Sequence, residues 1–388
     1  MYHHRLGKIV SRHAIYERTV STQPAPAWHV APLAHRKRHM TILASSSADA
    51  GLLSIDEEDD RYRPRLLAGW LAAVAALIVL MVVVGGITRL TESGLSIVEW
   101  KPVTGAVPPL SDAAWQQEFA DYQTSPEYRV KNRGMSLAEY KNIYFWEWAH
   151  RLLGRLIGLA FALPLLVFWL KGWVPPGYRG RLVALLGLGG LQGVIGWWMV
   201  TSGLANVAAV SHVRLAVHLN LALFIIACIV WTASDLLRGK ARLTGFAALA
   251  GGVLLVQLVL GAFVAGLDAG YIYAEWPMMG GGIFPSYVDW LQPLWRNIVD
   301  NPVVVQFVHR WWAWLTAAIL VLLAIKAMKR GSRKTPIALK TLIALQIILG
   351  ISTLLSGVEI WIAAAHQGVA ALIVWCTAAC AHRIGEAR

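Results

Sequence analysis

Long runs of apolar residues, separated by short polar stretches, make up most of this chain. A helix needs about 20 apolar residues to cross the hydrocarbon core of a bilayer, and eight runs reach that length. They cover residues 66–86, 145–170, 181–201, 214–234, 244–266, 304–326, 337–356 and 360–381. The pattern therefore predicts an all-α polytopic membrane protein with eight transmembrane helices.

The polar stretches between the runs indicate the orientation. Lysine and arginine gather before the first run and at the junctions 171–181, 238–242 and 326–340, whereas the opposite loops 202–213 and 357–359 contain neither. Because cytoplasmic loops carry the excess of basic residues, both termini are expected on the cytoplasmic side, or on the matrix side of a mitochondrial protein. The long first loop is then external, and it contains a predicted helix from Ser111 to Tyr122.

Composition narrows the class of protein. Of the 388 residues, 57% are hydrophobic and 15% are charged, with a formal net charge of +13. Nucleic-acid binding would require the basic residues to form one stripe, but they fall in short clusters between apolar runs. We therefore expect membrane lipid, and no nucleic acid, around the chain. The three cysteines lie inside apolar runs, which favours neither a disulfide framework nor a thiolate metal site.

Residues 1–60 differ from the rest of the chain. Segment 1–40 carries half of the twelve histidines and seven Lys/Arg against one acidic residue, Glu17, and it lacks a long apolar core. We expect a disordered N-terminal extension without function, and we assign its scattered histidines no metal. The alternatives are a mitochondrial transit peptide, which is also basic and poor in acids, and a true start at Met40.

The remaining chain consists of two repeated halves, residues 61–236 and 237–388. The matches are Gly85 and Glu99 with Gly261 and Glu275 (shift 176), His150-Arg151 with His309-Arg310 (shift 159), Gln192 and Gly196 with Gln346 and Gly350 (shift 154), and His218 with His366 (shift 148). Each half has four crossings, an even number, so both halves have the same orientation. The sequence thus predicts two four-helix bundles related by a pseudo-twofold axis along the membrane normal.

Each half places one histidine on its second helix and one on its fourth, near the external end. With a rise of about 1.5 Å per residue, His150, His218, His309 and His366 all lie roughly 6–9 Å below that end. Two neutral imidazoles that face each other at one depth suit the two axial positions of a haem iron. A lone buried histidine is commonly a packing residue, but the same pair in both halves favours ligation. No Glu-x-x-His pattern recurs in both halves, which argues against zinc or di-iron.

Polar residues beside these histidines allow two interpretations. Arg151 and Arg310 directly follow ligand candidates. An arginine inside the membrane needs an anion, which a haem propionate would supply, or else its side chain extends to the external headgroups. Gln192 and Gln346 suit interhelical hydrogen bonds better than contact with a cofactor.

Other features are interpreted as structural. Small residues allow helices to approach closely, and this is the expectation for Gly85, Gly86, Gly189, Gly190 and Gly193. His212 is expected in an external loop, and His382 is expected at the terminus without a partner. Each of the two lacks a matching residue in the other half.

The two halves differ beside one histidine. Glu147 lies one helical turn before His150 and on the same face, whereas the corresponding residue before His309 is Gln306, which cannot ionise. This difference predicts one reactive site, with Glu147 as its catalytic acid or base, and one electron-storing site. The alternative for Glu147 is a solvated carboxylate at the mouth of the helix.

The first external loop, from Arg89 to Lys101, is dense in charges and hydroxyl groups. It follows Gly85-Gly86 and contains Trp100, a residue suited to the membrane interface. Loops of such content are often functional. We therefore expect this loop to lie over the outer histidine pockets as a lid.

Several strings in the chain resemble haem A synthases. The stretch from Gly85-Gly86 to Ser96, followed by Glu99-Trp100-Lys101-Pro102, resembles the first external loop of that family. Glu147 to Arg151, Gln192 with Gly196-Trp197, and His366-Gln367-Gly368 are similar as well. The resemblance covers about residues 62–383. Because the chain lacks an external cysteine pair, it resembles the proteobacterial and mitochondrial branch.

The resemblance implies a function and a division of roles. The family oxidises a ring methyl group of haem O to a formyl group, by two hydroxylations and loss of water, and so makes haem A for cytochrome c oxidase. By this resemblance the C-terminal half holds haem b through His309 and His366 beside Arg310. The N-terminal half takes haem O between His150 and His218, beside Glu147 and Arg151.

The resemblance also implies partners and a location. These are haem O synthase, an electron donor, and the bacterial inner membrane, with the mitochondrial inner membrane as the alternative; an oligomer is compatible with the sequence. Two other functions stay open from the residues. A non-catalytic haem-b electron-transfer protein explains the histidines but not the difference between Glu147 and Gln306. A transporter explains the repeat, but no pair of helices broken by Gly or Pro lies near the midplane.

Overall fold

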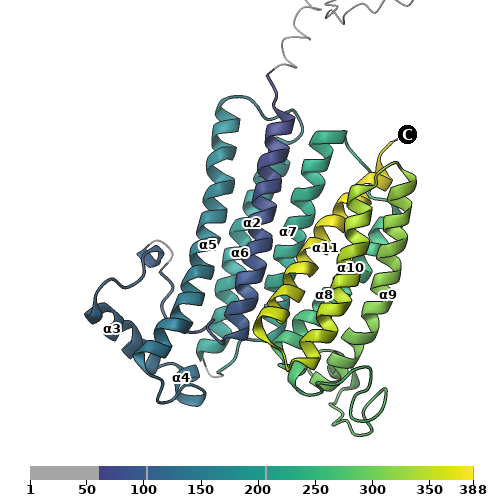
Figure 1. Ribbon diagram of the computed structural model, residues 1–388. Coiled ribbons are helices and arrows are strands. Elements are labelled where there is room, and N and C mark those ends of the chain that lie inside the picture. Colours follow the sequence, from purple (N-terminus) through teal and green to yellow (C-terminus); the bar gives the residue numbers. More distant parts are fainter. Residues whose placement is uncertain (1–60, 102–103, 206–207, 388) are drawn as a thin grey trace, which may run out of the picture. The chain divides into compact units, whose positions relative to one another are not determined.

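The structure is a computed structural model that describes residues 61–101, 104–205 and 208–387. The expectation of a disordered extension at 1–60 lies outside the described residues. Within these ranges, eight helices are long and apolar enough to cross a membrane (Figure 1). They are α2 (Pro64–Leu90), α5 (Leu137–Leu170), α6 (Arg179–Ala205), α7 (His212–Arg238), α8 (Gly245–Gly266), α9 (Pro302–Lys329), α10 (Lys334–Leu355) and α11 (Ile360–Gly385). Each overlaps one predicted run, so the all-α prediction of eight transmembrane helices is confirmed.

Most of these helices extend beyond the predicted run, and α5 shows the reason most clearly. The Ser136 hydroxyl accepts a hydrogen bond from the Glu139 N–H at 3.3 Å, and the Glu139 carboxylate accepts one from the Ser136 N–H at 2.8 Å. This reciprocal capping box satisfies two donors that a helix start leaves unpaired. The helix therefore begins at Leu137 rather than near residue 145, and its first turns are polar.

The extension of α5 supports two short helices of the first external segment. These are α3 (Asp112–Gln123) and α4 (Pro126–Val130). α3 confirms the helix predicted from Ser111 to Tyr122, and the Ser111 side chain caps it. The buried ring of Tyr122 stacks on Tyr140 of α5 with 5.1 Å between centroids. Trp115 meets Tyr144 edge-on at 5.0 Å, so aromatic pairs fix α3 on α5.

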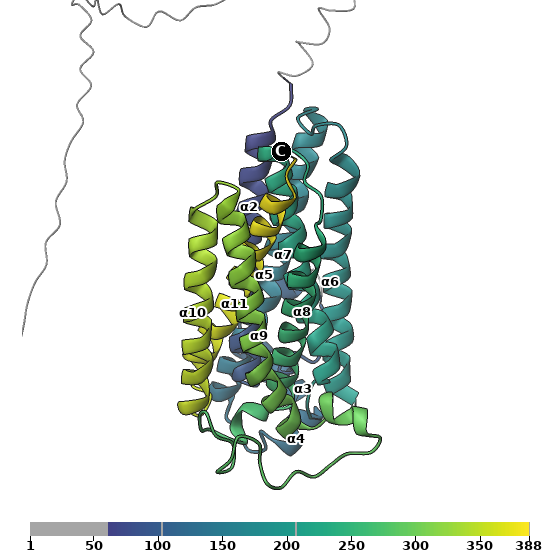
Figure 2. The ribbon, with the colours of Figure 1, turned by 90° about the vertical axis from the view of Figure 1, so that its right-hand side faces the viewer.

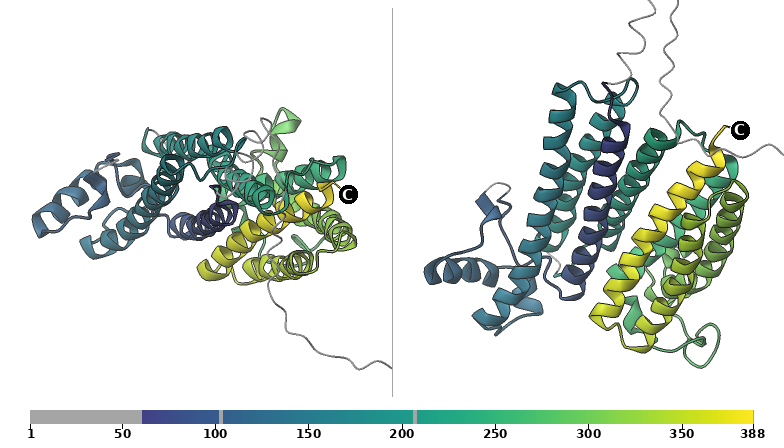
Figure 3. Two further views of the ribbon diagram at one scale, coloured as in Figure 1. Left: turned by 90° about the horizontal axis from the view of Figure 1, so that it is seen from above. Right: turned by 45° about the horizontal axis from the view of Figure 1, so that its top comes forward.

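The long helices pack in two sets. Helices α2, α5, α6 and α7 contact one another in sequence around the first set, and α8, α9, α10 and α11 do so in the second. The sets also touch, because α11 packs on both α2 and α7, and α7 packs on α8. Viewed from above, the first four helices lie on one side and the last four on the other (Figure 3). The division of the chain at 236/237 stays a prediction.

Both chain ends of the described bundle lie at one end of it. The first residues of α2 and the last residues of α11 are close to the same level (Figure 1), as an even number of crossings requires. The segments 91–136 and 267–301 lie at the opposite end (Figure 2). Which side of the membrane each end faces stays a prediction.

A polar cluster around the buried carboxylate of Asp235 joins α6, α7 and α11 near the ends that carry the chain termini. The His382 side chain is fully buried, and its Nε2 lies 2.9 Å from Oδ1 of Asp235. The other oxygen of Asp235 is paired with Arg181. The prediction that His382 has no partner is wrong. The reason is that α11 continues past residue 381 and carries His382 against α7, a contact that the sequence alone does not reveal.

Candidate functional site

Each of the four matched histidines lies against a glycine of the preceding long helix. A Cβ atom on Gly85 would lie 3.0 Å from Nε2 of His150. Cβ atoms on the other three glycines would lie 2.9, 3.1 and 2.9 Å from Cε1 of the histidines that they face. The three further pairs are Gly196 with His218, Gly261 with His309, and Gly350 with His366. Any side chain at these glycines would crowd the ring, so glycine allows the imidazole to lie between two packed helices.

The N-terminal pair opens into a large cavity. His150 of α5 and His218 of α7 both line a space of about 910 Å³, near the upper end of the usual range for ligand pockets. Both imidazoles face this one space, from helices that each pack on α2 and α6. His309 of α9 and His366 of α11 come in the same way from helices that each pack on α8 and α10. The structure thus brings the four histidines together in the two predicted pairs, and their binding of iron stays a prediction.

Glutamines hold three of the four rings. Gln192 Nε2 lies 3.2 Å from Nδ1 of His218 and donates to the carbonyl of the same histidine at 2.9 Å. Gln346 Nε2 lies 3.3 Å from Nε2 of His366. The expected interhelical hydrogen bonds of Gln192 and Gln346 are confirmed, and their partners are the histidines themselves.

A third glutamine was missed by the sequence interpretation. Gln257 Nε2 lies 3.1 Å from Nδ1 of His309 and donates to its carbonyl at 3.2 Å. The spacing could have identified it, because Gln257 precedes Gly261 by four residues, as Gln192 precedes Gly196. The amide oxygens of the three glutamines are buried without a hydrogen-bond partner among the described residues.

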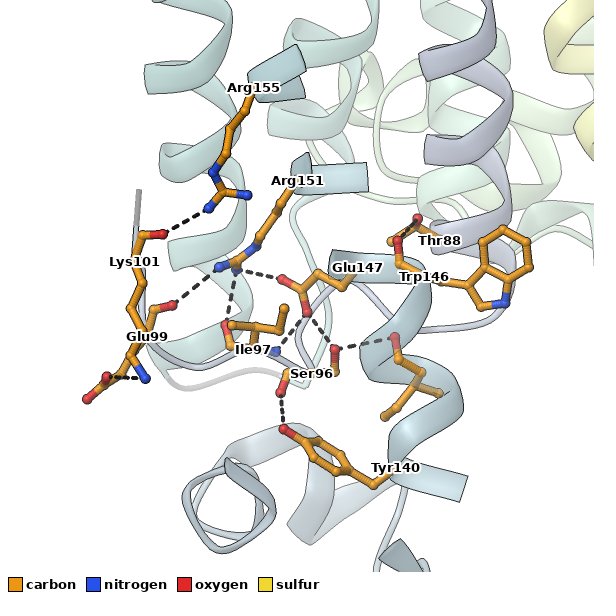
Figure 4. Close-up of polar contacts among 11 residues, drawn as sticks. Thr88, Ser96, Ile97, Glu99, Lys101, Tyr140, Trp146, Glu147, Arg151 and Arg155 are labelled. Atoms are coloured by element: carbon orange, nitrogen blue, oxygen red, sulfur yellow. Dashed lines mark hydrogen bonds and ion pairs between the residues drawn. The ribbon is translucent and has the colours of Figure 1, made fainter. Parts of the chain in front are cut away.

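Glu147 is buried in the wall of the cavity. Only 3% of the residue is exposed, so the alternative of a solvated carboxylate at the helix mouth is wrong. Its Oε2 accepts hydrogen bonds from the Ser96 hydroxyl at 2.7 Å and from the Ile97 N–H at 2.8 Å. Its Oε1 is paired with Arg151 at 2.5 Å. Figure 4 shows these groups converging on one carboxylate.

The arginines after the carboxylate hold the first external loop. Arg151 donates to the carbonyls of Ile97 at 3.1 Å and of Glu99 at 3.3 Å. One turn further along α5, Arg155 donates to the Lys101 carbonyl at 2.9 Å (Figure 4). The partners of Arg151 are therefore loop carbonyls and Glu147. Its predicted contact with a haem propionate stays a prediction.

The C-terminal half repeats this arrangement with one change. Arg310 donates to the carbonyls of Tyr273 at 2.8 Å and of Glu275 at 3.0 Å. Tyr273 and Glu275 correspond to Ile97 and Glu99 at the shift of 176 residues already found for the external motifs. Gln306 takes the place of Glu147, and its amide donates to the Tyr273 carbonyl at 3.2 Å. At this position a carboxylate accepts from one loop, whereas an amide donates to the other.

The first external loop lines the cavity, which bears out its predicted position for the N-terminal histidine pair. Thr88, Arg89, Leu95 and Trp100 line it together with His150 and His218. Arg89 also forms an ion pair with Asp268 at 2.7 Å, which ties the loop to the C-terminal set of helices. The lid expected from Arg89 to Lys101 therefore lies over the N-terminal histidine pair.

The glycines of α6 do not pack as expected. Cβ atoms on Gly189, Gly190 and Gly193 would meet no neighbour within 4 Å, so the prediction of close helix packing is wrong for these three. They line the cavity instead, because side chains are missing from that face of α6. For Gly85 and Gly86 the prediction is confirmed, since a Cβ on Gly86 would lie 2.6 Å from Oε1 of Gln367.

Two further residues differ from the sequence interpretation. His212 is the first residue of α7 and not a loop residue, and its Nε2 lies 3.2 Å from Oδ1 of Asp300.

Glu127 of α4 also lines the cavity, although nothing in the sequence singled it out. Only 3% of it is exposed, and it accepts a hydrogen bond from the Tyr122 hydroxyl at 3.1 Å. Burial raises the pKa of the Glu127 carboxyl to about 7, against the opposing effect of that hydrogen bond.

Eight apolar helices, interior histidine pairs and a large cavity define a polytopic membrane protein with room for a ligand among its helices. The model of the cytochrome oxidase assembly protein family matches residues 68–378, and the chain belongs to this family.

Curated relatives carry a more specific name. A heme A synthase of Sphingopyxis alaskensis is 50% identical over 331 residues, which cover 84% of this chain and 93% of the relative. A heme A synthase of Novosphingobium aromaticivorans is 49% identical over 336 residues, covering 83% and 96%. One of Rhizorhabdus wittichii is 52% identical over 319 residues, covering 80% and 92%. The resemblance to haem A synthases is confirmed, and the chain is a multi-pass protein of the bacterial inner membrane.

Proposed function

We propose that this protein is a haem A synthase, an enzyme that oxidises a ring methyl group of haem O to a formyl group. Its product, haem A, would serve cytochrome c oxidase. The relatives named heme A synthase share about half of their residues with most of this chain. The observation that carries the proposal is the cavity of about 910 Å³ that contains His150, His218 and the buried Glu147. An electron carrier without a substrate would not need such a space, and the relatives described above are named heme A synthase.

The residues present fit a haem in each half. Neutral imidazoles in facing pairs are suitable axial ligands of haem iron, and ligating histidines need a hydrogen-bond partner that fixes the ring. The glutamines beside His218, His309 and His366 place an amide at each ring, and their amide oxygens, which have no partner among the described residues, would accept the ring N–H once the amide turns. We assign the substrate haem to His150 and His218, and a resident haem b to His309 and His366. Bound haem supplies the redox chemistry.

The difference between the halves supports this assignment. Glu147 lines the cavity and can hold or accept a proton at its carboxylate, whereas Gln306 can do neither. Ser96, which donates to Oε2 of Glu147, connects that carboxylate to the external loop. We therefore place turnover in the N-terminal half, with Glu147 as the catalytic acid or base. In this role Arg151 keeps the carboxylate oriented toward the cavity.

The remaining assignments concern the surroundings of the enzyme. We place both termini in the cytoplasm, because the basic junctions lie at that end of the bundle. The histidines and the loop from Arg89 to Lys101 then belong to the outer leaflet. A haem O synthase would supply the substrate, and a separate electron donor would reduce the protein. These partners are inferred from the reaction and not from a docking surface.

The experiment is expression of the chain in bacteria that make haem O but lack their own haem A synthase. Haems extracted from the membranes are separated by chromatography and identified by mass. We expect haem A in cells with the chain and only haem O in cells without it. Membranes that contain normal amounts of the protein and yield haem O alone would contradict the proposal.

A further inference from the structure

The glutamine contacts follow a pattern that occurs on three of four comparable helices. On α6, α8 and α10 a glutamine precedes a glycine by four residues, and both face the histidine of the next helix. The three motifs are Gln192-x-x-x-Gly196, Gln257-x-x-x-Gly261 and Gln346-x-x-x-Gly350. On α2 the glycine is Gly85, and the residue four positions earlier is Met81. Methionine thus stands where the other three helices have the amide.

The methionine at position 81 changes the surroundings of one histidine, His150. Among the described residues, no side chain forms a hydrogen bond with this histidine, whereas the other three matched histidines each have a glutamine. Met81 lines the cavity beside His150. Its Cε lies 3.1 Å from the position of a Cβ on Gly154, one turn beyond His150 on α5. The methionine therefore packs on the helix that carries the histidine without holding its ring.

The comparison with Gln257 isolates the chemical difference. Gln257 contacts both Nδ1 and the backbone carbonyl of His309, which fixes the ring relative to its own helix. A thioether offers no donor and only a weak acceptor, on a flexible stem. Removing the partner that orients a metal-bound histidine typically weakens metal affinity about 10- to 100-fold. The ring of His150 is therefore the least constrained of the four.

We propose that Met81 makes His150 the exchangeable axial ligand, so that the haem substrate enters and the product leaves by breaking the bond to this histidine. Gln257, at the equivalent position, keeps the haem of the second half resident. This inference rests on the proposed function for the identity of the substrate, but the strength of each ligand can be measured without turnover. Met81 acts here as a positioning residue that sets the rate of exchange.

The test exchanges the two residues. The full-length protein, purified with its bound haem, is mixed with excess apomyoglobin, and the transfer of haem is followed by its absorption spectrum. Met81→Gln installs the missing amide with little change in side-chain size, and Met81→Leu controls for a change of shape without an amide. We expect Met81→Gln to slow the faster phase of transfer about tenfold and to raise the low-spin fraction, with Met81→Leu transferring at the wild-type rate.

The reciprocal variant tests the other half. Gln257→Met should convert the slowly released haem into one that is lost about 10 to 100 times faster. If this variant does not accumulate, Met81→Gln against Met81→Leu decides the question alone. Equal transfer rates in wild type, Met81→Gln and Met81→Leu would overturn the inference even if the cells make haem A. Slower transfer in Met81→Gln, from a protein whose cells make no haem A, would sustain the inference and contradict the proposed function.

Discussion

In each half an arginine, Arg151 or Arg310, donates hydrogen bonds to the external loop. The residue four positions before it accepts hydrogen bonds from the loop in the N-terminal half and donates one in the C-terminal half. In the N-terminal half, the carboxylate of Glu147 accepts hydrogen bonds from Ser96 and from the backbone N–H of Ile97. In the C-terminal half, the amide of Gln306 donates to the carbonyl of Tyr273. The repeat therefore preserves the frame around each histidine pair and changes the group that can exchange a proton.

The largest expected effects come from removing the histidines, which test whether the halves have different tasks. His309→Ala and His366→Ala should deplete tightly bound haem b, because each removes an axial ligand. His150→Ala and His218→Ala should retain haem b and yield membranes that contain haem O without haem A. Spectra of the purified variants and chromatography of extracted haems measure both. Loss of haem b from the second pair of variants, with haem A still formed, would reverse the assignment of the halves.

The next effect concerns the carboxylate that distinguishes the halves. Glu147→Gln should lower conversion of haem O by about a hundredfold to ten-thousandfold, the usual contribution of a general acid or base, while haem b is retained. Extracts should then contain haem O or the singly hydroxylated haem. The matched control is Gln306→Glu, which places a carboxylate in the other half and should not restore turnover to Glu147→Gln. Near-normal haem A from Glu147→Gln would limit this residue to holding the loop.

A smaller effect should follow from crowding one histidine at a time. A Cβ on Gly350 would lie 2.9 Å from the His366 ring, so Gly350→Ala forces that ring to move, at a cost of about 1–3 kcal/mol. Haem b content should fall severalfold in this variant, and Gly196→Ala should reduce turnover instead. Gly69→Ala is the control, because a Cβ on Gly69 of α2 meets no atom within 4 Å. Equal haem b content in Gly350→Ala and Gly69→Ala would mean that the His366 ring moves without weakening the binding of haem b.

The smallest expected effect is a pH dependence of the free energy of unfolding, caused by Glu127 in the N-terminal half. Burial raises the pKa of Glu127 to about 7, so the folded state binds this proton more tightly than the unfolded chain does. The resulting stabilisation is complete below the ordinary pKa of 4.5 and is lost as the pH rises through about 7. Tyr122, Lys131, Glu92 and Glu147 are the groups that act on it.

Glu127→Gln should remove that dependence. The variant should gain thermal stability relative to wild type when the pH is raised from 5.5 to 8, by a few degrees in the midpoint of unfolding. The measurement is thermal unfolding of the detergent-solubilised protein at both pH values. A difference between variant and wild type that does not change with pH would show that Glu127 does not titrate in this range.

The membrane helices could be predicted because an apolar run of sufficient length has one stable arrangement in lipid. Their ends could not, since α5 starts with a polar capping box at Ser136 and α11 ends past residue 381. The histidine pairs were predicted because the repeat presents each residue twice. Gln257 could have been predicted in the same way, from its position four residues before Gly261.

Other parts of the site depend on contacts that no local pattern encodes. Glu127 and Glu147 come from different helices and face the same cavity only after α3 packs on α5 and α4 packs on α6. The pairing of Asp235 with His382 joins residues 147 positions apart. The open face of α6 was misjudged because glycine allows both close packing and empty space, and only the position of the neighbouring helix distinguishes them.

The pair of Asp235 and His382 also bears on the order in which the protein is made. Asp235 enters the membrane with α7, when Arg181 of α6 is already available to its carboxylate. His382 follows with α11, and its buried side chain shares Oδ1 of Asp235 with the backbone N–H of Ala241, which donates at 3.2 Å. A chain that ended before His382 would keep Arg181 and the Ala241 N–H at Asp235 and would lose the contact with α11. The last of the eight long helices therefore completes a cluster that α6 and α7 begin.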